Sequence, residues 1–249
     1  MTQTHAAATP PVLIGTSHGT DSLEGRAAIA SILAGVRAAR PALAVREAFV
    51  DVQEPAVGDV VADVLAGPAA PSGGAPADVR AVVVPLLLSS GFHTYVDIAA
   101  AAAPDGAVAT GALGPDERLA QIVVERLRAA GATPADAVVL AAAGSSDARA
   151  AAAVEEVLAA VRERWDGPVT VGYGAGATPR VADAVGQARA DGASRVVVAA
   201  YLLAPGFFLD RLREAGADVV TAPLAPDARL AQIVLERYDD AVAGRATLV

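Results

Sequence analysis

The strongest constraint on the fold is an internal repeat. The segment GPDERLAQIVVER at residues 114–126 returns with few changes as APDARLAQIVLER at residues 225–237. An apolar run that ends in Gly-Phe also occurs in both halves, at residues 82–92 and 197–207. This pattern predicts a tandem duplication with its joint near residues 131–136. We therefore expect both halves of the chain to adopt the same fold.

Each half alternates short apolar runs with stretches of helical period. In the first half, the runs that predict strands begin at residue 12 and cover residues 43–52, 81–88 and 108–110. Helical patterns follow after Asp21, Pro55, Asp97 and Asp116, and Asp21 with Glu24 predicts a capping box at the first helix. The alternation predicts an α/β fold of two tandem doubly wound parallel-sheet lobes, flavodoxin-like units that face a central cleft.

We expect a disordered tail at residues 1–11, a first lobe at 12–133 and a second lobe, a degenerate repeat, at 134–249. The tail lacks the features of a signal peptide, and no apolar run approaches the ~20 residues of a membrane span. The chain has no cysteine, which excludes disulfides and thiolate metal sites. Its net charge of −9 argues against nucleic acid or a membrane as a partner. A cytoplasmic location is the simplest expectation.

Polar residues follow the strands of the first half but not those of the second. Of the three histidines, His18 and His93 follow predicted strands, and Asp51 ends another. Ligands of open α/β sheets bind beyond the carboxyl ends of the strands, so these side chains are expected to meet. Their equivalents in the second half are Ala143, Phe208 and Ala175. The chemistry is therefore expected in the first lobe alone.

Three interpretations of these residues compete. Two imidazoles with a carboxylate from Asp51 or Glu54 would suit a divalent ion such as iron, cobalt or nickel and leave a coordination position open. The segment GTSHG at residues 15–19 also matches the G-x-S-x-G elbow of serine hydrolases. In the third interpretation, both histidines are structural loop or capping residues, and Glu54 stabilises the start of a helix.

Three blocks of the first half resemble the sirohydrochlorin chelatase family, the class II chelatases of siroheme and cobalamin synthesis. They are TSHGT at residues 16–20, AFVDVQEP at 48–55, and VVPLLLSSGFH at 83–93, followed by Asp97-Ile98. The resemblance covers residues 12–127 and, more weakly, the second half. It implies two metal-handling histidines, at positions 18 and 93, and an acidic residue at 51. Phe92 departs from the small residues or histidines that many members carry before that position.

The resemblance implies an enzyme, a lyase, that inserts a divalent metal (Fe²⁺ or Co²⁺) into a sirohydrochlorin-type tetrapyrrole without ATP or an organic cofactor. Iron, for siroheme synthesis, is favoured; a cobaltochelatase and a non-catalytic metal- or tetrapyrrole-binding protein are the alternatives. We expect His18, His93 and Asp51 to be catalytic and, together with Glu54, to hold the metal. The residues expected to contact the tetrapyrrole are Thr16, Ser17, Gly19, Ser89, Ser90, Gly91 and Phe92. A monomer is expected, with the cleft formed within one chain.

Overall fold

The computed structural model describes residues 10–67, 79–89 and 92–245, without the side chains of residues 92–95. The predicted tail therefore lies almost wholly outside the described residues. The strands of the first lobe are β1 (Val12–Ser17), β2 (Val45–Phe49), β3 (Ala81–Pro85) and β4 (Ala107–Ala109). Those of the second lobe are β5 (Ala137–Ala142), β6 (Val169–Tyr173), β7 (Val196–Tyr201) and β8 (Val219–Val220).

Both sheets are parallel and have the same strand order, β2-β1-β3-β4 and β6-β5-β7-β8. Helices connect the strands in each lobe. The helices of the first half are α1 (Leu23–Ala39), α2 (Val57–Ala66), α3 (Phe92–Ala101) and α4 (Glu117–Ala129). Those of the second half are α5 (Ala148–Arg162), α6 (Val181–Ala190), α7 (Phe207–Arg213) and α8 (Ala228–Val242). The two-lobe, doubly wound α/β fold is thus confirmed.

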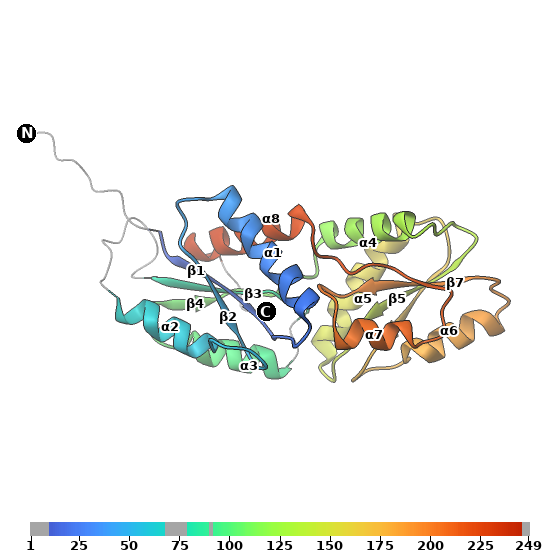
Figure 1. Cartoon of the computed structure of the whole chain (residues 1–249), viewed down its shortest axis with the longest axis horizontal. Coiled ribbons are helices and arrows are strands. Elements are labelled where there is room, and N and C mark those ends of the chain that lie inside the picture. Colours follow the sequence, from blue (N-terminus) through green and yellow to red (C-terminus); the bar gives the residue numbers. More distant parts are fainter. Residues whose placement is uncertain (1–9, 68–78, 90–91, 246–249) are drawn as a thin grey trace, which may run out of the picture.

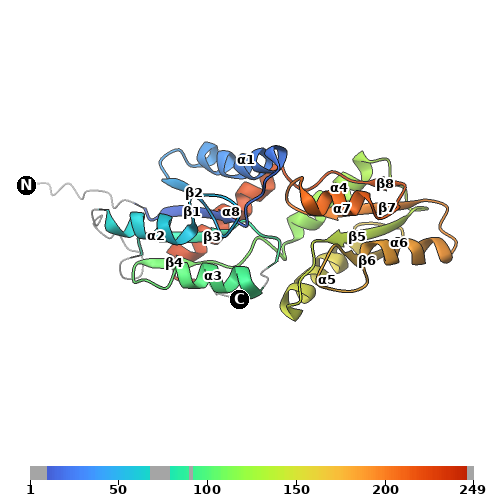
Figure 2. The same ribbon diagram turned by 60° about the horizontal axis from the view of Figure 1, so that its bottom comes forward.

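Helices cover both faces of each sheet. Successive residues of a strand point to opposite faces, so Leu13 of β1 packs in the cluster that includes α1 and α8, whereas Ile14 packs with α2 and α3. Figure 2 shows α1 and α3 on opposite sides of the first sheet. None of the helices in the described ranges is long and apolar enough to cross a membrane.

Some predicted element boundaries were wrong. β2 ends at Phe49 and β3 at Pro85, because their hydrogen-bonded partner β1 stops at Ser17. The N-cap of α1 is Ser22, not Asp21: the Ser22 hydroxyl accepts a hydrogen bond from the Gly25 N–H at 3.1 Å. Helix α3 begins at Phe92 rather than near Asp97. His93 therefore lies in the first turn of a helix.

The last helix of each half packs on the other half's lobe. Helix α8 lies against α1 and β3 of the first lobe, and α4 lies against α5 and β7 of the second (Figure 1). The Tyr238 hydroxyl on α8 donates a hydrogen bond to the carbonyl of Pro11 at 2.7 Å, just before β1. In space, the two halves therefore exchange a helix.

The exchanged helices are tied together by reciprocal ion pairs. The Arg118 guanidinium on α4 donates to Glu236 on α8 at 2.7 Å, and Arg229 on α8 donates to Glu125 on α4 at 2.8 Å. Because Arg118 and Arg229 occupy the same place in the repeat, as do the two glutamates, one contact is the twofold image of the other. The symmetry of the duplication therefore persists in the structure.

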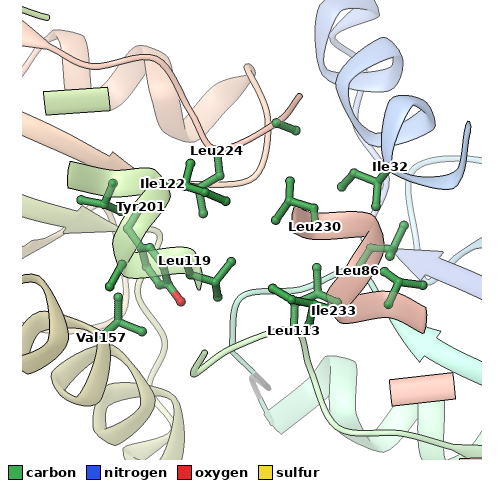
Figure 3. Close-up of a cluster of buried hydrophobic side chains, with 14 of the residues drawn as sticks. Ile32, Leu86, Leu113, Leu119, Ile122, Val157, Tyr201, Leu224, Leu230 and Ile233 are labelled. Carbon is green, nitrogen blue, oxygen red and sulfur yellow. The ribbon is translucent and has the colours of Figure 1, made fainter. Parts of the chain in front are cut away.

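One hydrophobic core runs through the junction of the lobes (Figure 3). Leu119 and Ile122 of α4 point into it beside Tyr201 of β7, and Leu230 and Ile233 of α8 point into it from the first lobe. All five side chains are 2 % exposed or less. The lobes are therefore held together by continuous apolar packing as well as by the ion pairs.

Asp116 and Asp227, the N-caps of α4 and α8, are predicted to make the protein acid-sensitive. Burial favours the neutral form of Asp116, but hydrogen bonds from the Arg118 side chain and backbone outweigh it and hold the pKa of Asp116 below its ordinary value. Arg229 does the same for Asp227. A depressed pKa in the folded state contributes stability above the unfolded pKa of ~3.9, and this stability is lost as pH falls through the folded pKa.

The free energy of unfolding of the double variant Asp116→Asn/Asp227→Asn should therefore be about 1–2 kcal/mol lower than that of wild type at pH 7. At about pH 3 the difference should shrink, because the two carboxyls are largely protonated in the unfolded wild-type chain, which lowers the free energy of unfolding of wild type. Urea unfolding at the two pH values measures both effects. Asp105→Asn, in an exposed loop, is the control and should show neither. A deficit of the double variant that stays constant between the two pH values would contradict this explanation.

Candidate functional site

The loops after β1 and β2 run side by side and place His18 next to Asp51. The Val50 N–H donates to the carbonyl of Ser17 at 2.9 Å, and the Asp51 N–H donates to the carbonyl of His18 at 3.1 Å. Both side chains are exposed to solvent. Backbone hydrogen bonds thus bring two of the predicted site residues together at the carboxyl edge of the first sheet.

Gly19 allows this close approach. Its φ of +97° favours glycine, and a Cβ there would lie 2.4 Å from the Asp51 carbonyl oxygen. The Thr20 N–H then donates to the Gln53 side-chain oxygen at 2.9 Å, which ties the two loops together a second time. Gly144 repeats the arrangement in the second lobe with φ +89°. Gly19 therefore has a structural role, whatever it contributes to binding.

The two candidate carboxylates differ in their surroundings. Asp51 Oδ1 accepts a hydrogen bond from the Val52 N–H at 2.8 Å, within the loop beside His18. Glu54 Oε2 accepts one from the Ala56 N–H at 2.9 Å, at the start of α2. Glu54 is thus engaged where a carboxylate stabilises a helix N-terminus. Asp51 is the better placed of the two to act with His18.

Thr16 and Ser17 are both buried, at 0 % and 5 % exposure. A serine nucleophile on an elbow has to be exposed at the top of its sheet, so the burial of Ser17 argues against the hydrolase interpretation. Thr16 Oγ1 finds no hydrogen-bond partner among the described residues. Such an atom is a candidate for contact with a ligand or water. Its equivalent in the second lobe is Ala141, which has no polar side chain to satisfy.

The third predicted segment is only partly described. Ser89 is half-buried after β3, Ser90 and Gly91 lie outside the described ranges, and the side chains of Phe92 and His93 are likewise outside them. Among the described side chains, which do not include the His93 imidazole, no three His, Asp or Glu residues form a group that could hold a metal ion. The joint action of His18, His93 and Asp51 on a metal therefore stays a prediction.

Loops of the second lobe close against this edge. A Cβ on Gly25 would lie 2.5 Å from the carbonyl oxygen of Pro205, and one on Gly206 would lie 3.3 Å from Thr20 Oγ1. The Tyr201 hydroxyl at the end of β7 lies 3.5 Å from the carbonyl oxygen of Leu88. Complete burial raises the pKa of Tyr201 far above its ordinary value, so this phenol stays protonated. The carboxyl-end loops of both sheets thus meet at one place.

Sequence reasoning missed two residues that shape the site. Gln53 joins the two first-lobe loops, and Val52 adopts a left-handed backbone with φ +60°. Their equivalents in the second lobe are Ala177 and Gly176, and Gly176 has nearly the same φ, +66°. A β-branched residue in place of this glycine was a signal already visible in the internal repeat.

The arrangement suits metal or proton handling. An imidazole exposed at the edge of a sheet can bind a metal or accept a proton, and a carboxylate in the adjoining loop can assist it. His18 and Asp51 provide this pair, and the helical turn that carries His93 follows the neighbouring strand β3. The second lobe keeps the same loop hydrogen bonds without the polar side chains.

Comparisons with known proteins agree with this description. The CbiX family model matches residues 12–130 and 137–241, one match in each half. Comparison with curated protein sequences finds no match. Among solved structures, "SirB from Bacillus subtilis with Fe3+" superposes with a TM-score of 0.74 at 19 % identity, covering 94 % of this chain and 96 % of that one.

Two further structures share the fold. SirB from Bacillus subtilis subspecies spizizenii, a sirohydrochlorin chelatase in complex with cobalt, has a TM-score of 0.69 at 18 % identity and covers 94 % and 95 % of the two chains. CbiX, described as the terminal enzyme for siroheme biosynthesis in denitrifying bacteria, has a TM-score of 0.64 at 20 % identity and covers 92 % and 99 %. Both matches of the family model together span most of the sequence, and the chain belongs to the CbiX family.

Proposed function

We propose that this protein is a chelatase that inserts a divalent metal into a sirohydrochlorin-type tetrapyrrole without ATP or an organic cofactor. The observation that carries the proposal is the backbone hydrogen bond that places Asp51 beside His18, in a member of the CbiX family. The second lobe keeps the same backbone and replaces both residues with alanine. The scaffold therefore does not require either side chain, which is expected of residues retained for chemistry.

The chemistry assigns roles to these residues. Insertion of a metal requires that two pyrrole protons leave the ring and that ring nitrogens replace the ligands of the ion. His18 accepts a proton or presents the metal, and Asp51, in the adjoining loop, assists it. His93, a residue of the first turn of α3, is the second histidine assigned to this step. The metal is a substrate and leaves with the product.

Iron is the favoured metal. The CbiX structure that shares the fold is described as an enzyme of siroheme biosynthesis, and one SirB structure holds Fe³⁺. The second SirB structure holds cobalt, so the cobaltochelatase alternative has its own support. Imidazole and carboxylate ligands suit both ions, and the choice between them has to come from rates. The cytoplasmic location and the monomeric state stay predictions.

The test is to follow the absorbance of sirohydrochlorin on addition of Fe²⁺, Co²⁺ or Ni²⁺, with and without the protein. A chelatase produces metallated tetrapyrrole in large excess over protein and faster than the spontaneous reaction, with Fe²⁺ the fastest of the three. A non-catalytic carrier yields at most one equivalent of metallated tetrapyrrole per protein molecule. Failure of the protein to accelerate metal insertion with any of the three ions would refute the proposed function.

A further inference from the structure

Large apolar side chains are strongly exposed at only four places in the described part of the chain. They are Leu23 (78 %), Phe207 (67 %), Val52 (48 %) and Val96 (44 %). Each follows the carboxyl end of a strand: Leu23 and Phe207 begin α1 and α7, Val52 lies between β2 and α2, and Val96 lies in α3. Exposed hydrophobic residues scattered over a surface need no explanation, but these share one edge of the two sheets.

Three of the four lie around the loop that carries His18. The Cβ of Val52 is 3.1 Å from where a Cβ of Gly19 would be. Gly206 directly precedes Phe207, and a Cβ on it would lie 3.8 Å from the Cβ of Ser22, the residue before Leu23. Close contacts thus connect the backbone next to Leu23, Val52 and Phe207.

The fourth residue, Val96, lies on the helix that carries His93. Helix α3 follows β3, which pairs with β1, so Val96 lies beyond the strand next to the one that leads to His18. Exposed apolar side chains therefore lie on the same segments as the two predicted metal-handling histidines.

The second lobe provides an internal control. By the register of the repeat, the equivalents of Leu23, Val52 and Val96 are Ala148, Gly176 and Arg211. Large apolar side chains at these positions are therefore not needed for the fold. The second lobe lacks a large apolar residue at all three positions, and it also lacks equivalents of His18, His93 and Asp51. The exposed apolar residues therefore occur together with the predicted catalytic residues.

The backbone conformation of Val52 also indicates a role beyond the fold. Its φ of +60° is unfavourable for a β-branched residue, and Gly176 adopts the same conformation without that penalty. An unfavourable backbone combined with an exposed valine side chain contributes little to the stability of the fold. Strain of this kind concentrates at functional sites, and here the gain has to come from something that the side chain contacts.

We propose that Leu23, Val52 and Val96, together with Phe207 from the second lobe, form an apolar rim that contacts the flat macrocycle of the tetrapyrrole. The proposal rests on the proposed function and adds the residues that bind the ring itself. A tetrapyrrole presents a broad hydrophobic face, and burying that face against four apolar side chains holds it over the histidines. The rim determines tetrapyrrole affinity and leaves metal binding to the polar residues.

The test uses one substitution that the second lobe already contains and one that has a matched control in the second lobe. Val52→Gly introduces the residue at the equivalent position 176, and Leu23→Ser is compared with Ala148→Ser at the same position of the other lobe. Each first-lobe variant should raise the KM for sirohydrochlorin and the Kd of the metal-free ring about 5- to 20-fold. The kcat should stay within about twofold of wild type, since the reacting groups are untouched.

Thermal unfolding and the control variant separate binding from stability. Val52→Gly should not lower the melting temperature, because it removes an unfavourable backbone conformation. Ala148→Ser should leave both KM and Kd unchanged. If wild type metallates sirohydrochlorin and both first-lobe variants keep wild-type KM and Kd, the rim is refuted and the proposed function stands. If wild type does not metallate sirohydrochlorin at all, both proposals fall together.

Discussion

Replacing His18 with alanine should slow enzymatic metal insertion by on the order of 100-fold or more, because it removes a group that binds the metal or accepts a pyrrole proton. The protein should still fold. Ala143 occupies the equivalent position in the second lobe, where its carbonyl accepts the same hydrogen bond, from the Ala175 N–H at 2.8 Å. The measurement is the rate of absorbance change of sirohydrochlorin with Fe²⁺, corrected for the spontaneous reaction.

The control for His18→Ala is thermal unfolding, which should give the wild-type melting temperature within a few degrees. Asp51→Asn and Glu54→Gln extend the test to the two carboxylates. Asp51→Asn should reduce the rate more than Glu54→Gln, because Asp51 lies beside His18 and Glu54 accepts a hydrogen bond at the start of α2. A fully active and stable His18→Ala protein would remove the basis of the assigned mechanism.

Replacing Leu230 with alanine should lower the free energy of unfolding by about 2–5 kcal/mol, the usual range for a buried leucine. Leu230 is 0 % exposed and belongs to α8, the helix that crosses from the second half onto the first lobe. Chemical unfolding monitored by circular dichroism measures the loss. Leu119→Ala at the equivalent position of α4, also 0 % exposed, should cost a similar amount.

Both leucine variants should still unfold in one transition, since a single core cluster contains residues of both lobes. Leu65→Ala, at a half-buried position of α2, is the control and should cost clearly less. Two separate transitions, with only one of them shifted by Leu230→Ala, would show that the lobes are energetically independent. The exchanged helices would then be a detail of packing rather than the link between the lobes.

The sequence predicted the parts of the fold that depend on local pattern. Apolar runs predicted the strands, and the repeat predicted that both lobes have one topology. The approach of Asp51 to His18 followed from the rule that the carboxyl ends of parallel strands share an edge. Predicted strand boundaries were wrong where pairing with a neighbouring strand determines the end of a strand, as at the end of β2.

Other features could not be predicted because they depend on contacts distant in the sequence. An amphipathic pattern shows that α4 and α8 bury one face, but their nearly identical sequences do not say which sheet each one covers. The same holds for the contact between Gly206 and Thr20, which joins the two lobes. The left-handed conformation of Val52 is unusual for valine, and only the glycine at its repeat position hinted at it.

The exchange of α4 and α8 bears on the history of the chain. A one-lobe ancestor with the same packing would have been a domain-swapped dimer, in which each copy completes the other with its last helix. Fusion of two such copies would remove the need for a second chain but not the mutual dependence of the lobes. The second lobe could then lose its polar residues and still be retained, because the first lobe is covered by a helix encoded in the second half.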